Sequence, residues 1–392
     1  MLALEGIKVL DLTRVLSGPY CAMMMADMGA DVMKIEPPGL GDDSRAFGPY
    51  VNGESAYYMS LNRNKRSMVL DFKNEKHKAV FLEMVKEADI VIENYRPGTM
   101  EKLGLGYKEV LSKINPRLIY LEISGFGATG PYMKKPAYDV VVQAMGGIMS
   151  ITGADGGEPT RVGASIGDVA AGIFGYGAAM TALYTRTITG KGQAIDVSML
   201  DCQVAMLENA ISRYQTTGIA PGPIGNRHPS ITPFVDFKAK DGKVIVGVAN
   251  QKLWKLYTDL IGRPDLFDDP RFATNLDRTN NVEALFEQLR PEMEKRTVDE
   301  WIAALEEKGI PCAPINDMAR ICNDPQVKAR EMLVELDHPG AGKMQVPGIP
   351  MKFSETPGAI RTAAPLLNHD IYEILNDLLG WDEATAKEKL GE

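Results

Sequence analysis

The segment RVGASIGDVAAGIFGYG, residues 161–177, contains one carboxylate, Asp168, among glycine, alanine and aliphatic residues. An aspartate near the start of a helix is often only a cap, because its side chain accepts hydrogen bonds from backbone N–H groups there. A carboxylate held in a tight, partly dry place can instead be a reactive group. The segment alone leaves both interpretations open.

A second set of side chains follows an apolar run in IENYRPGTMEKLGLG, residues 92–106. Asn94, Tyr95 and Arg96 are expected at the carboxyl end of a strand, which is the usual ligand edge of a parallel sheet. Arg96 and Lys102 could hold phosphate groups, and Tyr95 could pack on a base. The alternative is a solvated loop without a ligand.

Two further acids have ordinary interpretations. Glu36 closes the predicted strand 31–36, where nicotinamide-binding folds place a ribose-binding acid. The preceding turn, TRVLSGP, has one glycine instead of the G-x-G-x-x-G pattern, so we expect no nicotinamide cofactor. Asp139 is expected in the first turn of a helix, where an acid interacts favourably with the helix dipole.

The elements that position these residues alternate between strands and helices, which indicates an α/β fold with a parallel sheet covered on both faces. Right-handed crossovers then bring the carboxyl ends of the strands to one edge. We predict strands at 7–12, 31–36, 67–72, 88–94 and 117–125, and helices at 18–30, 74–87 and 99–114.

Beyond residue 138 the pattern becomes mainly helical. Gly172, Gly175 and Gly177 interrupt the predicted helix 168–187, and helical glycines indicate close packing of another backbone or a ligand. A turn-rich linker and a hairpin around Asp241 and Gly242 follow. Further helices are predicted at 138–150, 199–217, 251–261, 282–295, 298–308 and 364–381. We therefore expect a large domain in 1–220, a small α+β domain in 225–325, and a C-terminal return to the large domain in 330–392.

Composition narrows the function classes. The 392 residues carry a net charge of −9, which argues against nonspecific nucleic-acid binding. We see no signal-peptide pattern at the start and no uninterrupted apolar stretch of about 18 residues, so we expect no membrane segment. The cysteines and histidines are few and scattered, which predicts reduced cytoplasmic thiols and no metal site.

Several segments together resemble the class III CoA-transferases, the group that includes formyl-CoA and carnitine CoA-transferases. They occur in the expected order over nearly the whole chain: GIKVLDLTRVLSGP, GADVMKIEPPGLGD, NRNKRSMVLDFK, VIENYRPGTMEKLGLGY, GFGATGPYMKKPAYDVVVQAMGG, GDVAAGIFG, GNRHPS and GIPCAPIND. The resemblance implies a Rossmann-like large domain built from both chain ends, a smaller inserted domain, and two interlocked subunits in a homodimer.

In the family that these segments resemble, the acid of the GD element is the nucleophile, which corresponds to Asp168. It would attack an acyl-CoA thioester to form a mixed anhydride, and the CoA thiolate would then form an enzyme thioester. A small carboxylic acid would accept the CoA by the reverse steps. The resemblance implies CoA as a substrate, with no metal, flavin or nicotinamide. Its CoA contacts fall on Val15, Leu16, Ser17, Leu70, Lys73, Asn94, Tyr95, Arg96, Lys102 and Tyr138.

Two positions depart from the resemblance, since Pro37 and Pro136 stand where some members carry arginine and lysine. The glycine-rich lid loop of formyl-CoA transferases is also absent, so the resemblance does not identify the carboxylic acids that are the substrates. A racemase on the same fold would need a histidine before the acid at 139, but Tyr138 stands there. A CoA-binding protein without catalysis, with Asp168 as a mere cap, is the third interpretation.

Overall fold

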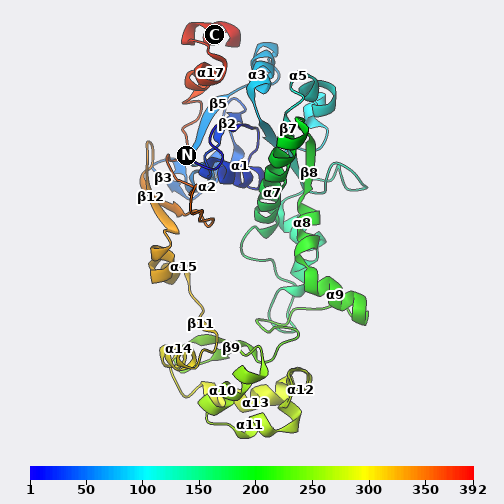
Figure 1. Ribbon diagram of the computed structural model, residues 1–392, viewed down its shortest axis with the longest axis vertical. Helices are drawn as coiled ribbons and strands as arrows, with labels where there is room; N and C mark the ends of the chain where they lie inside the picture. The colour runs from blue at the N-terminus through cyan, green and yellow to red at the C-terminus, as the bar shows by residue number, and fades with distance from the viewer. The chain divides into compact units, whose positions relative to one another are not determined.

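The computed structural model describes residues 1–392 and divides into two compact units. Unit 1 consists of Met1–Ile148, Val162–Ile211 and Pro325–Glu392, and unit 2 consists of Met149–Arg161 and Ser212–Asp324 (Figure 1). Unit 1 therefore contains both ends of the chain. Residues 225–324 of the expected small domain all fall in unit 2, which also takes in 149–161 and 212–224.

The core of unit 1 is a six-stranded parallel sheet in the order β5-β2-β1-β6-β7-β8. This is the doubly wound order in which the strand sequence reverses between β1 and β6, and ligands bind outside the carboxyl ends at such a point. The prediction of a mixed α/β fold with a parallel sheet is confirmed. The strands are β1 Lys8–Asp11, β2 Asp31–Glu36, β5 Lys65–Val69, β6 Ile90–Glu93, β7 Ile119–Ser124 and β8 Ala194–Ser198.

Helices cover this sheet, and two short hairpins complete unit 1. The helices are α1 Ser17–Asp27, α2 Ala56–Leu61, α3 Glu75–Glu87, α4 Thr99–Lys102, α5 Ser112–Ile114, α6 Asp139–Met145, α7 Ile166–Thr189, α8 Met199–Met206, α16 Pro325–Ala329, α17 Ile371–Leu379 and α18 Glu383–Leu390. The hairpins are β3 Tyr50–Val51 with β4 Glu54–Ser55, and β12 Leu333–His338 with β13 Gly342–Pro347.

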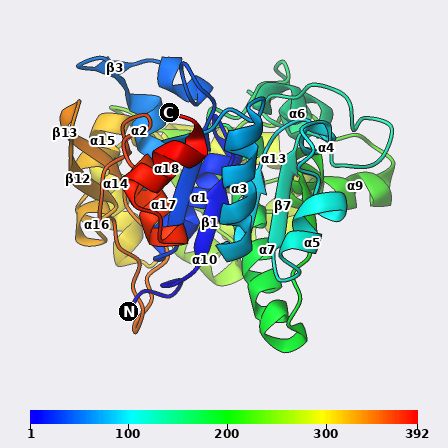
Figure 2. The same ribbon diagram turned by 90° about the horizontal axis from the view of Figure 1, so that it is seen from above.

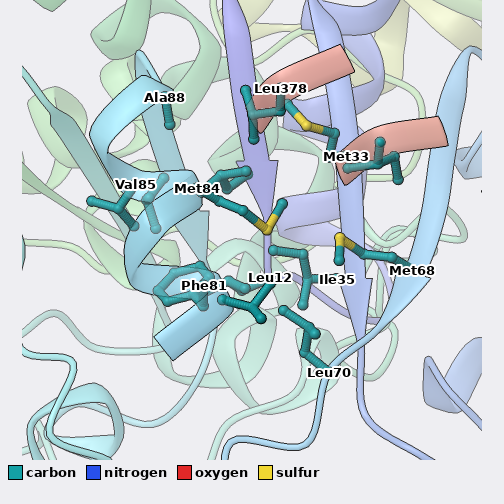
Figure 3. Close-up of a cluster of buried hydrophobic side chains, with 14 of the residues drawn as sticks. Leu12, Met33, Ile35, Met68, Leu70, Phe81, Met84, Val85, Ala88 and Leu378 are labelled. Carbon is teal, nitrogen blue, oxygen red and sulfur yellow. The ribbon is translucent and has the colours of Figure 1, made fainter. Parts of the chain in front are cut away.

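One apolar cluster joins the N-terminal strands to the C-terminal helices. Figure 3 shows strand side chains such as Met33 and Met68 packed against Phe81 and Met84 of α3 and Leu378 of α17. All five are buried, and burial of such a side chain contributes about 1.5–3 kcal/mol. The helices α17 and α18 lie beside α3 (Figure 2), so the end of the chain completes this core.

Helix α7 packs closely on α1 through its small residues. A Cβ atom at Gly172 would lie 2.9 Å from the carbonyl oxygen of Ser17, and one at Gly175 would lie 3.0 Å from Ile123 Cδ1. The predicted close approach of another backbone is therefore confirmed at Gly172, whereas Gly175 packs against side chains and Gly177 faces open space. By length and composition α7 could also cross a membrane; it packs against α1, β7 and β8, and 39% of its most apolar stretch is buried.

Unit 2 has an antiparallel sheet in the order β11-β10-β9 and a set of helices around an apolar core. The hairpin predicted around Asp241 is confirmed as β9 paired with β10. The elements are α9 Glu208–Thr217, which begins in unit 1, β9 Phe234–Lys238, β10 Lys243–Gly247, α10 Gln251–Leu260, α11 Asp265–Asp268, α12 Asn275–Asn280, α13 Val282–Met293, α14 Val298–Glu307, β11 Cys312–Pro314 and α15 Met318–Asn323.

Several boundaries differ from the predictions. The predicted helix 99–114 is broken into α4, a π-helical turn and α5, because Gly104 adopts a left-handed conformation with φ of 74°. The predicted helix 199–217 breaks at Leu207, and the helix predicted from 364 begins only at Ile371. Strand β8 was not predicted, since only its last two residues are buried and its pattern is weak.

Candidate active site

The loops that follow β1, β2, β5 and β6 surround a cavity of about 230 Å³, which we call the edge cavity. Its walls combine apolar side chains with a few polar groups at the carboxyl ends of the strands. The lining residues are Leu12, Thr13, Arg14, Ile35, Glu36, Pro37, Pro38, Asp42, Leu70, Asp71, Phe72, Lys73, Tyr95, Thr99 and Leu103. A mainly apolar recess with few polar groups is typical of small-molecule and cofactor sites.

Three of the predicted CoA contacts, Leu70, Lys73 and Tyr95, line the edge cavity. Two others are chain neighbours of lining residues, since Arg96 follows Tyr95 and Lys102 lies between Thr99 and Leu103. Lys73, Arg96 and Lys102 are exposed, and no carboxylate forms an ion pair with them. The structure thus leaves three cations at this edge available to an anionic ligand.

Asn94 holds the loop that follows β1. Its Oδ1 accepts a hydrogen bond from the Arg14 N–H at 2.9 Å, and its Nδ2 donates to the Arg14 carbonyl at 2.8 Å. The same Nδ2 donates to Ser17 Oγ at 3.3 Å. Asn94, which was predicted as a CoA contact, therefore holds both ends of the segment 14–17, which contains the predicted contacts Val15, Leu16 and Ser17.

A buried ion pair supports the same loop from below. Lys34 Nζ lies 2.8 Å from Asp42 Oδ2, and both side chains are fully shielded from solvent. Lys34 also donates to the Thr13 carbonyl at 2.8 Å, and Asp42 Oδ1 accepts from the Val15 N–H at 3.0 Å. Val15 has φ of 67°, which is an unfavourable conformation for a β-branched residue. The pair thus stabilises a strained loop.

The protonation states of this pair agree with an ionised bridge. Burial alone would raise the pKa of Asp42, but the charge of Lys34 and the hydrogen bonds from Lys34, Ser44 and Val15 together hold that pKa well below its usual range. Burial would lower the pKa of Lys34, yet Asp42 and Asp11 together raise it. The sequence gives no periodic signal for this contact, because Asp42 lies in a loop beyond the strand that carries Lys34.

Glu36 is unavailable as a ribose ligand. Its two carboxylate oxygens accept hydrogen bonds from Arg45 at 2.7 and 2.8 Å, and one of them also accepts from Ser67 Oγ at 2.7 Å. The other oxygen accepts from the Asp42 N–H at 2.9 Å. Burial opposes ionisation, but the hydrogen bond from Arg45 and the charge of Lys34 lower the pKa of Glu36. Its role is therefore to hold the loop after β2.

Asp168 lies in the first turn of α7 and is half-buried. The Ser17 hydroxyl forms a hydrogen bond with its carboxylate. Burial raises the pKa of Asp168 to about 7, the charge of Asp139 acts in the same direction, and the Ser17 hydrogen bond opposes them. A carboxyl group of raised pKa is more basic, and in its ionised form it is a better nucleophile.

The cap of α7 comes from another helix. Asp139 Oδ1 accepts a hydrogen bond from the Gly167 N–H at 2.8 Å, and its Oδ2 accepts from Gln143 Nε2 at 2.7 Å. The N-cap residue itself, Ser165, makes no side-chain cap. Asp139 therefore provides the side-chain cap of α7, and the Asp168 carboxylate makes no cap hydrogen bond.

Two further groups lie near Asp168: the start of α1 at Ser17, a predicted CoA contact, and the side chain of Tyr57, which was not predicted. Helix α1 begins at Ser17. The backbone N–H groups of Ser17 and Gly18 have no hydrogen-bond acceptor in the chain, and Pro19, the next residue, has no N–H. Tyr57 of α2 is also close enough for its titration to respond to Asp168, since burial and then the Asp168 charge raise the pKa of Tyr57 to about 12. Free N–H groups at a helix start can stabilise a developing oxyanion.

Tyr138 is not brought to the edge cavity. It is the N-cap residue of α6 and its side chain is 76% exposed. Val15 and Leu16 do not line the cavity either, although the loop that contains them adjoins it through Arg14. No group of three or more histidine, cysteine, aspartate or glutamate side chains is arranged to hold a metal ion.

Comparison with known proteins gives consistent results. The family model described as CoA-transferase family III matches residues 4–371. The acetyl-CoA:oxalate CoA-transferase of Acetobacter aceti is 46% identical, covering 91% of this chain and 92% of that protein. The human succinyl-CoA:glutarate CoA-transferase is 38% identical over 99% of this chain and 88% of its own length. A CAIB/BAIF family protein from Brucella suis, 39% identical, superposes with a TM-score of 0.84 over 96% of this chain and 99% of its own.

Proposed function

The chain belongs to CoA-transferase family III and transfers CoA between acyl-CoA thioesters and carboxylic acids; on that premise we propose that Asp168 carries the transfer covalently. The observation that carries this proposal is the state of Asp168. Its side chain is half-buried, its pKa is raised, and it is not needed to cap α7, because Asp139 makes the cap. A carboxylate in that state is prepared to attack a carbonyl group.

In the first half of the reaction, an Asp168 oxygen attacks the thioester carbonyl. The C–S bond breaks, which leaves a mixed anhydride and the CoA thiolate. The thiolate then attacks the Asp168 carbonyl carbon and expels the donor acid as a carboxylate, so that an aspartyl-CoA thioester remains. Splitting the exchange into such steps lowers each barrier.

In the second half, the acceptor carboxylate attacks the Asp168 carbonyl carbon and expels the CoA thiolate. The thiolate attacks the acceptor carbonyl of the new anhydride and regenerates the Asp168 carboxylate. No net proton is consumed. We place the tetrahedral oxyanions at the free N–H groups of Ser17 and Gly18, and Ser17 already contacts the nucleophile.

We propose that CoA itself occupies the edge cavity. The apolar walls of Leu70, Phe72 and Leu103 suit the base, and Tyr95 lies in the same wall. Lys73, Arg96 and Lys102, which lack ion-pair partners, would hold the phosphates. Pro37 lines the cavity where some relatives carry a cation, so these three carry the charge recognition here.

The acid substrates are proposed to be dicarboxylic. The names of the two relatives include oxalate, succinyl-CoA and glutarate, whose acids have two carboxylates, although the first relative also names acetyl-CoA, whose acid has one. We also propose a homodimer, because α7 exposes Ile173, Phe174, Tyr184 and Ile188 on the face turned away from α1. The mass of the assembly in solution, measured by light scattering, tests this.

The four cysteines are free thiols, which fits a reducing cytoplasm.

A racemase is not favoured. A racemase would need its base at or beside Asp139. Both oxygens of the Asp139 carboxylate already accept hydrogen bonds, one from the Gly167 N–H and the other from Gln143 Nε2. His77 lies elsewhere, with its Nδ1 accepting a hydrogen bond from the Asp71 N–H at 2.9 Å. Enzymes of this family transfer CoA, so a CoA-binding role without catalysis is not favoured either.

The test is the intact mass of the protein after incubation with acyl-CoAs and hydroxylamine. Hydroxylamine would trap the activated Asp168 carbonyl as a hydroxamate, about 15 Da heavier than the parent protein. The adduct is expected in the parent and absent in Asp168→Ala. Asp201→Ala is the matched control, because Asp201 is also a first-turn aspartate but is exposed. An adduct that persists in Asp168→Ala would overturn the proposal.

A further inference from the structure

Glu93, the last residue of β6, is a buried acid that the mechanism described above does not use. Its side chain is 3% exposed, and no lysine or arginine forms an ion pair with it. The other buried acids at this edge, Asp11, Glu36 and Asp42, each pair with a lysine or arginine at 2.7–2.9 Å. A buried carboxylate without a cation is costly in its ionised form, so Glu93 is expected to hold a proton instead.

The charged groups that face Glu93 are themselves acids. Glu122 of β7 lies opposite it in the strand register, and Asp196 of β8 lies opposite Glu122 in turn. One oxygen of Glu122, Oε1, is shielded from solvent and has no hydrogen-bond partner. Burial and the charge of Glu122 raise the pKa of Glu93 to about 8, and Glu101 of α4 acts in the same direction. At neutral pH the Glu93 side chain is therefore mainly protonated.

The carboxyl group of Glu93 joins the loop after β6 to the neighbouring strand. Its Oε2 accepts a hydrogen bond from the Tyr95 N–H at 2.6 Å, and its Oε1 accepts one from Tyr120 Oη at 2.8 Å. The Tyr120 ring stacks on Tyr107, with centroids 5.4 Å apart, which fixes the position of the hydroxyl. A proton on Glu93 Oε1 keeps both contacts, because this oxygen then donates to Tyr120 Oη while Oε2 still accepts from Tyr95.

The loop that Glu93 holds belongs to the edge cavity. Tyr95 lines that cavity, and the next residue, Arg96, is one of the three exposed cations at this edge. An ionised Glu93 would add a shielded negative charge beneath a loop that is proposed to bind phosphates. Like charges repel more strongly where water is excluded, so bound phosphates and an ionised Glu93 disfavour each other. Such coupling is reciprocal, because a ligand that favours the proton is itself favoured by the proton.

We propose that Glu93 is a positioning residue that binds its proton together with CoA, so that the neutral side chain holds Tyr95 in the wall of the edge cavity. This inference rests on the function proposed above, since it takes CoA to be the occupant of that cavity. The proton is not transferred during the reaction. It sets the pH range in which CoA binds well, and CoA affinity is expected to fall as the pH rises above about 8.

The first test is calorimetric titration of the full chain with CoA at pH 8, in buffers of different ionisation enthalpy. The parent is expected to take up to about half a proton more per CoA than Glu93→Gln, because about half of the free protein has lost the Glu93 proton at this pH. Glutamine carries one donor and one acceptor, so both contacts of the neutral acid remain. Glu101→Gln is the control, since it removes an exposed charge at the same edge and should keep most of the uptake. Equal uptake in the parent and Glu93→Gln would overturn the inference.

The second test is the pH profile of CoA affinity. Between pH 7 and pH 9 the Kd of the parent is expected to rise about fivefold, if CoA binding and the proton favour each other about tenfold. The rise should be absent in Glu93→Gln. Glu93→Ala lacks both contacts and should bind CoA more weakly than Glu93→Gln at pH 7. An equally steep profile in the parent and Glu93→Gln would contradict the inference. Because Asp168 titrates near pH 7, the comparison is repeated in the Asp168→Asn background.

A third variant separates this inference from the proposed function. Arg96→Met is expected to weaken CoA binding at least about tenfold, because a phosphate loses its charge-assisted hydrogen bonds. Unchanged affinity in Arg96→Met would show that CoA is not held at this edge, and the proposed site and the inference would fail together. Weakened binding in Arg96→Met, with the same proton uptake in the parent and Glu93→Gln, would overturn the inference alone.

Discussion

The two units bury charge in different ways. Unit 1 shields Asp11, Lys34, Glu36, Asp42 and Lys65 beneath its ligand edge, and these groups form ion pairs such as Lys65 with Asp11 at 2.9 Å. The buried polar side chains of unit 2 are two threonines and one cation, Arg278. Buried ion pairs contribute little net stability compared with apolar packing, so their concentration in unit 1 calls for another explanation.

The explanation lies in the backbone segments that the buried charges of each unit hold in place. In unit 1 they donate to or accept from the backbone of the loop after β1, at Thr13 and Val15. In unit 2, Arg278 donates to backbone carbonyls of Thr232 at 2.7 Å and Phe272 at 3.1 Å, and its guanidinium lies 4.9 Å from the Trp254 ring. Charge is thus used in unit 1 to hold a strained active-site loop and in unit 2 to join structural segments.

The largest effect is expected from breaking the Lys34–Asp42 pair. Lys34→Met leaves a buried carboxylate without its partner, which should lower the free energy of unfolding by about 3–5 kcal/mol. It should also lower kcat/KM for acyl-CoA at least about tenfold, because a displaced loop misplaces Ser17. Denaturant unfolding and steady-state kinetics measure the two effects.

The double variant Lys34→Met/Asp42→Leu sharpens this result. Replacing both charges with apolar side chains should recover most of the stability, because no unpaired charge remains buried. The kinetic defect should persist, since Thr13 and Val15 still lack their partners. Recovery of both quantities would show that the pair has no positioning role.

Arg278→Met makes the corresponding change in unit 2. The carbonyls of Thr232 and Phe272 lose their donor, so the free energy of unfolding should fall by about 2 kcal/mol. The rate of Asp168 adduct formation should stay the same. A reduced rate in a variant that remains folded would contradict the contrast between the units.

The pH dependence tests the raised pKa of Asp168, which is about 7. Attack requires the ionised carboxylate, so kcat/KM for acyl-CoA should fall about tenfold for each pH unit below 7. A profile that is flat between pH 5 and 8 would contradict this expectation.

The same pKa has a consequence for stability. Because the folded state binds this proton more tightly than the unfolded state, Asp168 lowers stability as the pH rises from about 4 to about 7. Asp168→Asn should therefore exceed the parent in melting temperature by more at pH 8 than at pH 5. An equal difference at both pH values would count against a shifted pKa.

The smallest effect is expected at a helix cap of unit 2. Thr297 and Glu300 form a capping box at the start of α14. Thr297→Ala should cost about 1 kcal/mol of stability without a kinetic effect. Thermal unfolding and kcat/KM would measure this, and a loss of activity would show that unit 2 transmits local strain to the reaction.

The same contrast explains what the sequence could predict. In unit 2 the helices α10, α13 and α14 begin where predicted and end within two residues of the predicted ends, because caps such as Asn250 and Thr297 are local signals. In unit 1 strand β2 was predicted at its observed bounds, because Gly29 marks the end of the helix before it and three of its six residues are apolar. Local patterns therefore suffice where local interactions define the element.

The roles within the site were harder to predict. Lys34 in a strand suggests an exposed residue, and its partner Asp42 comes from a loop with no periodicity. Asp139 resembled an ordinary first-turn acid, yet it caps a helix that begins at Ile166. Asp168 and Tyr95 were singled out from local sequence patterns, whereas the nucleophilic role of Asp168 and the contacts Leu70 and Lys73 came from resemblance to the family. The other roles in the site depend on contacts between segments that are distant in the sequence.

The order of synthesis follows from the chain's division between the units. Unit 2 is finished at Asp324, whereas the apolar cluster under β2 and β5 needs Ile374 and Leu378 from α17. Domains generally fold as they emerge from the ribosome. The inserted unit can therefore be native while the core of unit 1 is still incomplete. Until its last helices are synthesised, Met33, Met68 and Phe81 remain uncovered. In that interval the nascent sheet exposes apolar surface, which makes partly folded chains prone to aggregate.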